Sequence, residues 1–93
     1  MIVGTLQLEL FIPASDSLKA KRSVLNSVKE RVRTRFNASV AEIDHQDLWQ
    51  RATLAVAVVG GAPGVVDHVL HDVISVVERE PRLQVLDIQL RVE

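Results

Sequence analysis

The chain of 93 residues is 47% hydrophobic, has a formal net charge of −1 and contains no cysteine. This length and hydrophobic content suit one domain with its own core, so we expect a single domain over residues 1–93. The lack of cysteine excludes disulfides, thiol catalysis and thiolate metal sites. No apolar stretch approaches the roughly 20 residues of a membrane span, and residues 1–11 lack the basic head of a signal peptide. These features predict a soluble, cytoplasmic protein.

The first predicted element is a strand over residues 2–12. Its apolar side chains recur with a period of two, at Leu6, Leu8, Leu10 and Ile12. Pro13 ends the strand, because a residue without a backbone N–H cannot continue a ladder. Asp16 or Ser17 is then expected to cap a helix, since either side chain can accept a hydrogen bond from an unpaired backbone N–H.

The segment SLKAKRSVLNSVKERVRTRF, residues 17–36, is predicted to be a strongly basic helix. It holds seven of the eleven Lys and Arg residues but a single acid, whereas the other 73 residues carry a net charge of −7. At 100° per residue, an apolar stripe is expected to face the sheet: Leu18, Leu25, Val28, Val32 and Phe36. A second row, spaced three and four residues apart, lies beside that stripe: Lys19, Arg22, Asn26, Lys29 and Arg33.

Two interpretations of this row remain open. A charged helix face is most often a solvated face with no ligand. The alternative is a surface that binds successive phosphates, because each Lys or Arg that neutralises a phosphate releases a condensed counterion. The absence of acids four residues from these cations favours an anionic partner, with nucleic acid first. The slightly acidic chain argues against tight non-specific binding.

Two strands are predicted next, over residues 38–43 and 51–59. The second is apolar on both faces, which is typical of a central strand. The segment VAEIDHQDLWQRA, residues 40–52, is rich in chemically active side chains: Glu42, Asp44, His45, Asp47, Trp49 and Arg51. Histidine and carboxylates suit several divalent ions, but adjacent Asp44 and His45 do not readily share one. We therefore expect Trp49 to anchor the connection between the strands and the acids to cap a turn.

The sequence GGAPG at residues 60–64 predicts a turn, followed by a helix over residues 65–79 and a strand over residues 86–92. This turn lacks the Lys-Ser/Thr continuation of a nucleotide-binding loop. His68 and His71 on the helix are expected to be surface residues and not metal ligands. With no nucleophile, base and orienting group in one motif, we expect no enzymatic activity, cofactor or metal.

The order of elements is βαββαβ, which predicts a ferredoxin-like α+β sandwich: a four-stranded antiparallel sheet with both helices on one face and strands one and three central. The other sheet face is then uncovered. We expect alanine, valine and one phenylalanine to line it, and a second copy of the chain to cover it. The predicted homodimer interface includes Phe11, Thr5 and Gln7.

The segments MIVGTLQLELFIP, SLKAKRSVL and RFNASVAEIDHQDLWQRATLAVAVV, with the apolar helix that follows, resemble the YlxP-like family of small bacterial proteins, a domain of unknown function. The resemblance covers nearly the whole chain and implies the ferredoxin-like fold. It implies no established activity, substrate or cofactor. In some bacteria the family is encoded near genes for translation initiation and ribosome assembly, which hints at RNA.

Three hypotheses follow: a module that binds RNA or the ribosome, a homodimeric protein-interaction module, and a small phosphatase of the acylphosphatase type. The phosphatase needs an Arg in a phosphate-binding loop after strand one, and IPASDS supplies none; a shared fold alone does not establish function. We favour the RNA- or ribosome-binding module, with the homodimeric module as the alternative.

Overall fold

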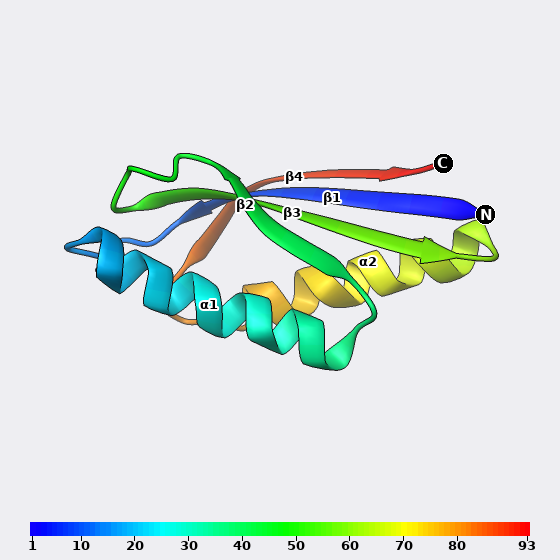
Figure 1. Ribbon diagram of the computed structural model, residues 1–93, viewed down its shortest axis with the longest axis horizontal. Coiled ribbons are helices and arrows are strands. Elements are labelled where there is room, and N and C mark those ends of the chain that lie inside the picture. Colours follow the sequence, from blue (N-terminus) through cyan, green and yellow to red (C-terminus); the bar gives the residue numbers. More distant parts are fainter.

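The computed structural model describes all 93 residues and has the predicted order of strands and helices (Figure 1). The elements are β1 (Ile2–Phe11), α1 (Leu18–Arg35), β2 (Ser39–Asp44), β3 (Arg51–Gly60), α2 (Pro63–Glu78) and β4 (Gln84–Val92). Both helices lie on one face of the sheet, as Figure 1 shows. The predicted ferredoxin-like fold is therefore confirmed.

The sheet has the strand order β2-β3-β1-β4, and every neighbouring pair is antiparallel. Strands β1 and β3 are central, as predicted, and pair without interruption from Ile2 opposite Gly60 to Phe11 opposite Arg51. The two outer pairs each contain an irregularity, between Glu9 and Leu10 on β1 and near the end of β2. These irregularities lie at the same end of the sheet, next to the β2–β3 connection.

The core lies between the sheet and the helices. The period-two pattern of β1 places its even-numbered leucines on this side, and Leu6, Leu8 and Leu10 are fully buried. Helix α2 contacts β1, β3 and β4, whereas α1 contacts β2 and α2. The buried residues of α2 repeat at helical spacing: Val66, Leu70, Val73, Ile74, Val76 and Val77.

Helix α2 approaches β1 closely at Gly4. A Cβ atom added at Gly4 would lie 2.3 Å from Cγ1 of Val66 and 2.8 Å from Cδ1 of Leu70. Both of these side chains are buried. A residue without a side chain at this position therefore allows the start of α2 to pack directly on the central strand.

Neither α1 nor α2 combines the length and the apolar character that would be needed to cross a bilayer.

Candidate anion-binding surface on helix α1

Helix α1 begins where the sequence predicted. The backbone of Ser17 is extended, and its hydroxyl accepts a hydrogen bond of 3.0 Å from the backbone N–H of Ala20. This is the N-cap arrangement, which satisfies one of the otherwise unpaired N–H groups of the first turn. Ser17, and not Asp16, is the cap.

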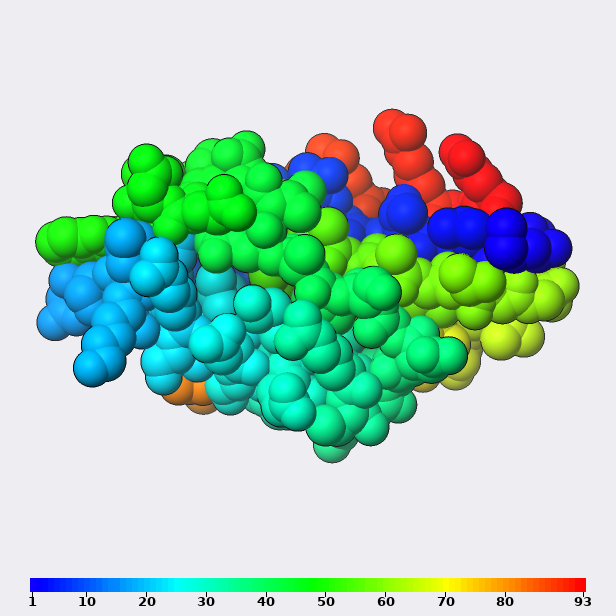
Figure 2. All heavy atoms as spheres, in the orientation of Figure 1, coloured from blue at the N-terminus to red at the C-terminus, as the bar shows by residue number.

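The predicted row of polar residues forms one side of α1, and we refer to it as the basic row: Lys19, Arg22, Asn26, Lys29 and Arg33. Lys29 is half-buried and the other four residues are exposed. In Figure 2 the outer surface of α1 lies directly below β2 and the β2–β3 connection. The basic row is therefore accessible along its length of about 21 Å, at about 1.5 Å per residue.

The cations of the basic row have no acidic partner. None of Lys19, Arg22, Lys29 and Arg33 forms an ion pair within 4.0 Å, and the only acid of the helix, Glu30, is also unpaired. Arg33 instead donates a hydrogen bond of 2.9 Å to the carbonyl of Val40 on β2. Lys19, Arg22 and Lys29 are thus free to interact with an external anion.

Lys21, in the middle of the same segment, has a different role. Its side chain is fully buried, and its Nζ donates to three backbone carbonyls, those of His45 (2.8 Å), Gln46 (3.2 Å) and Arg51 (3.2 Å). It also lies 3.0 Å from a carboxylate oxygen of Glu42. Lys21 therefore ties the β2–β3 connection to the first turns of α1.

Sequence reasoning missed this role of Lys21, although a signal was present. Lys21 precedes Val24, Leu25 and Val28 by three, four and seven residues, the spacing of one helix face. All four residues are buried. The buried face of α1 is thus centred nearer Lys21 than the predicted stripe, and Leu18 and Phe36 are only partly buried.

Two more cations surround a buried carboxylate at the end of α2. Glu80 accepts hydrogen bonds from the guanidinium groups of Arg82 and Arg31 and from the backbone N–H of Arg82. The pKa of Glu80 is lowered to about 2, first of all by the hydrogen bond from the Arg82 side chain and further by those from the Arg82 backbone N–H and Arg31. Burial opposes this shift. This cluster joins α1 to the segment after α2, so Arg31 has a structural role and is not free to bind an external anion.

The β2–β3 connection differs from its prediction. Trp49 was expected to anchor it, but its side chain is 56% exposed, and Ile43 and Leu48 are also exposed. The segment is instead anchored by Lys21, which donates to three of its carbonyls. His45 is the only non-glycine residue with positive φ, at 60°, and the Asp44 carboxylate accepts a hydrogen bond from its backbone N–H.

The side chain of His45 reaches the open face of the sheet. There its Nε2 lies 3.6 Å from Glu9. The Thr53 hydroxyl donates its one proton to the Glu9 carboxylate, with both carboxylate oxygens at 2.9 Å, and Arg51 lies 3.8 Å from the same carboxylate. No three His, Asp or Glu side chains are placed to share a metal ion anywhere in the chain. On α2, His68 and His71 are exposed and lie near Asp72 and Asp67 one turn away. Each histidine thus lies beside a carboxylate.

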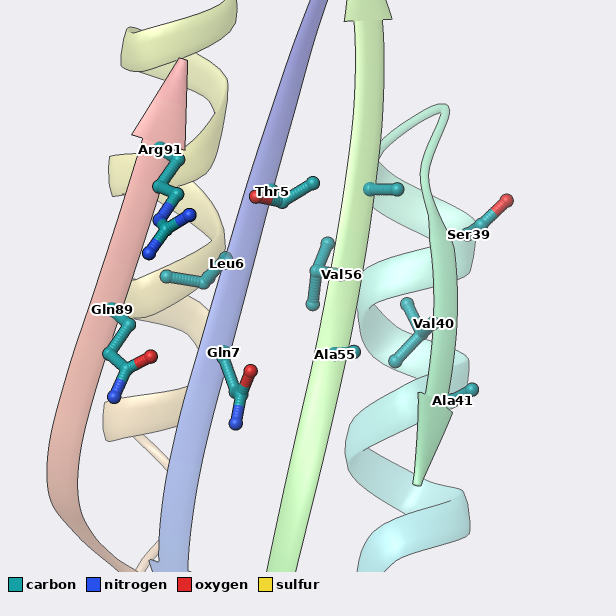
Figure 3. A pocket seen from close by; sticks show the side chains of 11 residues that line it. Thr5, Leu6, Gln7, Ser39, Val40, Ala41, Ala55, Val56, Gln89 and Arg91 are labelled. Atoms are coloured by element: carbon teal, nitrogen blue, oxygen red, sulfur yellow. The ribbon is translucent and has the colours of Figure 1, made fainter. Parts of the chain in front are cut away.

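The open face of the sheet carries the residues predicted for an interface. Thr5 is exposed, whereas Gln7 and Phe11 are half-buried. Figure 3 shows the side chains that line a groove on this face, with Ala55 of β3 next to Gln7 of β1 and with β2 on the far side of β3. The groove has a volume of about 500 Å³. Ala55 and Ala57 of β3 line the groove, but β4 adds Gln89 and Arg91. This face is therefore more polar than β1 and β3 alone predicted.

Comparisons with solved structures agree with the fold. A designed protein with a ferredoxin fold, LFR1 1, superposes with a TM-score of 0.64 at 14% identity, over all of this chain and 88% of the other. The designed protein Foldit4 superposes with a TM-score of 0.57 at 7% identity, over all of this chain and 97% of the other. At these identities the similarity concerns the fold alone.

Comparisons of sequence identify the family. The chain is 32% identical over 83 residues to the uncharacterized protein YlxP of Bacillus subtilis (strain 168). These aligned residues cover 89% of this chain and 90% of that protein. Residues 3–90 match the family described as protein of unknown function DUF503. The chain therefore belongs to the DUF503 family, and the predicted resemblance to YlxP-like proteins is confirmed.

Proposed function

We propose that the protein binds RNA, free or on the ribosome, through the basic row of α1. The observation that supports this proposal most directly is that Lys19, Arg22 and Lys29 have no acidic partner and face solvent along one side of one helix. By contrast, Lys21 and Arg31, which join parts of the fold, each have an acidic partner. The charges of Lys19, Arg22 and Lys29 are not neutralised within the chain, so all three side chains can interact with an external anion.

The mode of binding follows from the kind of residues present. Recognition of RNA by many sheet-based domains uses aromatic side chains on which bases stack. This chain has only three aromatic residues, and the one on a central strand, Phe11, is half-buried. We therefore propose contacts to the phosphate backbone, which depend strongly on salt and weakly on base sequence. No catalytic activity is part of this proposal.

The test is a pair of matched double variants. Arg22→Gln with Lys29→Gln removes two charges from the basic row; Arg35→Gln with Arg79→Gln removes two from exposed residues outside it. Arg33 is left unchanged because it bonds to β2. RNA binding is measured by fluorescence anisotropy over a range of salt concentrations. The row variant should reduce the slope of log K against log salt by about 1.4–1.8, at roughly 0.7–0.9 per contact.

The control variant should bind with the slope of the unmodified protein. Equal losses in both variants would show that only total charge matters, and an unchanged slope in the row variant would return the row to the solvated-face interpretation. Neither variant should unfold more easily, because exposed charges contribute little to stability. The alternative function, a protein-interaction module, predicts instead a partner that survives nuclease treatment in a pull-down from lysate.

A further inference from the structure

Strand β4 is an edge strand whose outer backbone groups have no partner. It pairs only with β1. Val3 and Glu93 exchange both of their backbone hydrogen bonds, at 2.8 and 2.9 Å. Because hydrogen-bonded pairs alternate along an antiparallel ladder, the odd-numbered residues of β4 point their N–H and C=O groups at β1. The groups of Ile88 and Leu90 therefore point away from the sheet.

This edge has few of the features that usually prevent a strand from pairing with another chain. Such features include short length, proline, a covering element, an inward-directed charge, charged side chains and bulges; of these, β4 has the irregularity opposite Glu9 and Leu10 and the charges of Asp87 and Arg91. The opposite edge, β2, has only six residues, and Arg33 donates to one of its carbonyls. In contrast, β4 has nine residues without proline or glycine, and Leu86 and Ile88 on it are 50% and 41% exposed. The β4 edge is therefore suited to accept another strand.

The charge pattern of β4 is self-complementary. Asp87, Gln89 and Arg91 lie on the open face of the sheet, opposite Glu9, Gln7 and Thr5 of β1, and Figure 3 shows the side chains of Gln89 and Arg91 there. Asp87 and Arg91 are exposed, and neither forms an ion pair within the chain. If β4 pairs with a second β4 about a two-fold axis at Gln89, Asp87 of each copy lies opposite Arg91 of the other.

Other registers lack this match. An axis at Asp87 or at Arg91 places two like charges opposite each other. An axis at Ile88 pairs Asp87 with Gln89, and an axis at Leu90 pairs Asp87 with Glu93. The outward groups of Ile88 and Leu90 also allow the register centred on Gln89, since these two residues then form hydrogen-bonded pairs across the interface. Like charges directly opposite destabilise a strand pair, whereas opposite charges stabilise it.

We propose that the protein forms a two-fold dimer in which β4 pairs antiparallel with β4 of a second copy, with the axis at Gln89. The two sheets join into one of eight strands, and Ile88 and Leu90 exchange four backbone hydrogen bonds. The exposed apolar side chain of Ile88 lies opposite Leu90 on the helix side. The partner is a second copy because the match requires the same strand in reverse, which is the isologous contact of a two-fold dimer.

Charge reversal tests the register. Asp87→Arg and Arg91→Asp each make both charged pairs repulsive, so each variant should weaken the dimer at least about tenfold in sedimentation equilibrium. The double variant restores two opposite-charge pairs and should regain a mass of twice 10.3 kDa. Arg79→Asp, which makes the same change in charge as Arg91→Asp at the exposed C-cap of α2, is the control and should not affect dimerisation. A monomeric unmodified protein, or a double variant no better than the single ones, would overturn the proposal.

A cysteine cross-link tests the position of the axis without depending on charge. Since the chain has no cysteine, Gln89→Cys introduces a single thiol that lies opposite its own copy at a Cα separation of about 4.5 Å, which suits a disulfide. It should link the dimer rapidly under mild oxidation. Gln7→Cys, on the same face but one strand inward, would place the two thiols three strand spacings apart, about 14 Å, and should not link. Linking through Gln7→Cys alone would indicate face-to-face stacking of the open sheet faces and overturn the edge pairing.

Discussion

Replacing Lys21 with methionine tests whether this buried cation is the anchor of the β2–β3 connection. Methionine keeps much of the apolar length of lysine but donates no hydrogen bond. The substitution leaves the carbonyls of His45, Gln46 and Arg51 without their donor and Glu42 without its counter-charge. Breaking a buried ion pair from one side costs about 3–5 kcal/mol. Because the Glu42 side chain is 14% exposed, we expect a cost near 3 kcal/mol.

That cost is large for a domain of this size. At about 0.05–0.15 kcal/mol per residue, 93 residues give a total stability of roughly 5–14 kcal/mol. The expected fall in melting temperature is about 12–24 °C, at about 4–8 °C per kcal/mol. Urea unfolding followed by far-UV circular dichroism measures the free energy of unfolding. Hydrogen exchange should also show faster exchange in the β2–β3 connection, which loses its contact with α1.

Two further variants separate this role from a general effect of charge. Lys19→Met removes an exposed lysine of the same helix and should change the free energy of unfolding by less than about 0.5 kcal/mol. Adding Glu42→Leu to Lys21→Met removes the stranded carboxylate and should recover part of the loss, since removing both partners costs less than removing one. A cost below about 1 kcal/mol for Lys21→Met alone would refute the anchoring role.

Packing around one glycine, one carboxylate and the single tryptophan gives three more expected outcomes. Gly4→Ala should destabilise the protein by about 1–3 kcal/mol through overpacking against α2, whereas Gly64→Ala, with open space around it, should not; thermal unfolding compares them. The pKa of Glu80 is lowered from 4.5 to about 2, so its stabilisation is present above pH 4.5 and is lost as the pH falls toward 2. Glu80→Gln should therefore remove roughly 2–3 kcal/mol at pH 7 and flatten the acid part of the stability profile. Trp49→Ala should change the stability by less than about 1 kcal/mol in urea unfolding, because the indole is exposed.

The fold could be predicted because its elements have local and periodic signals. The alternation in β1, the helical spacing in α2 and the turn signals between them each depend on neighbours in sequence. The double-sided apolar pattern of β3 also gave its central position. The open-face residues Thr5 and Gln7 followed from the same alternation, and the basic row followed from the geometry of one helix.

The errors concern side chains whose environment comes from distant segments. The carbonyls that receive Lys21 lie 24 to 30 residues away in sequence, and no local pattern indicates that they converge on it. Trp49 was expected to anchor the β2–β3 connection but is exposed, and the buried contacts of that connection are made by Lys21 instead. The burial of Glu80 likewise depends on Arg31, 49 residues away. Polar networks formed by tertiary contacts therefore could not be predicted from the periodicity of the sequence.

The strand order connects the two proposals and gives them a joint test. Helix α1 contacts β2, while β4 is the opposite edge, so a dimer through β4 leaves both basic rows accessible at the two ends of one continuous sheet. Seven strand spacings separate the outer strands, about 34 Å. An RNA long enough to reach both rows should bind with a gain from effective concentration, whereas a short one should not. We therefore expect Arg91→Asp, which lies outside the basic row, to weaken the binding of a structured RNA of about 40 nucleotides far more than that of a fragment of about 6 nucleotides. Equal weakening of both would mean that Arg91 contacts RNA directly, and no weakening of either would mean that the two rows act independently.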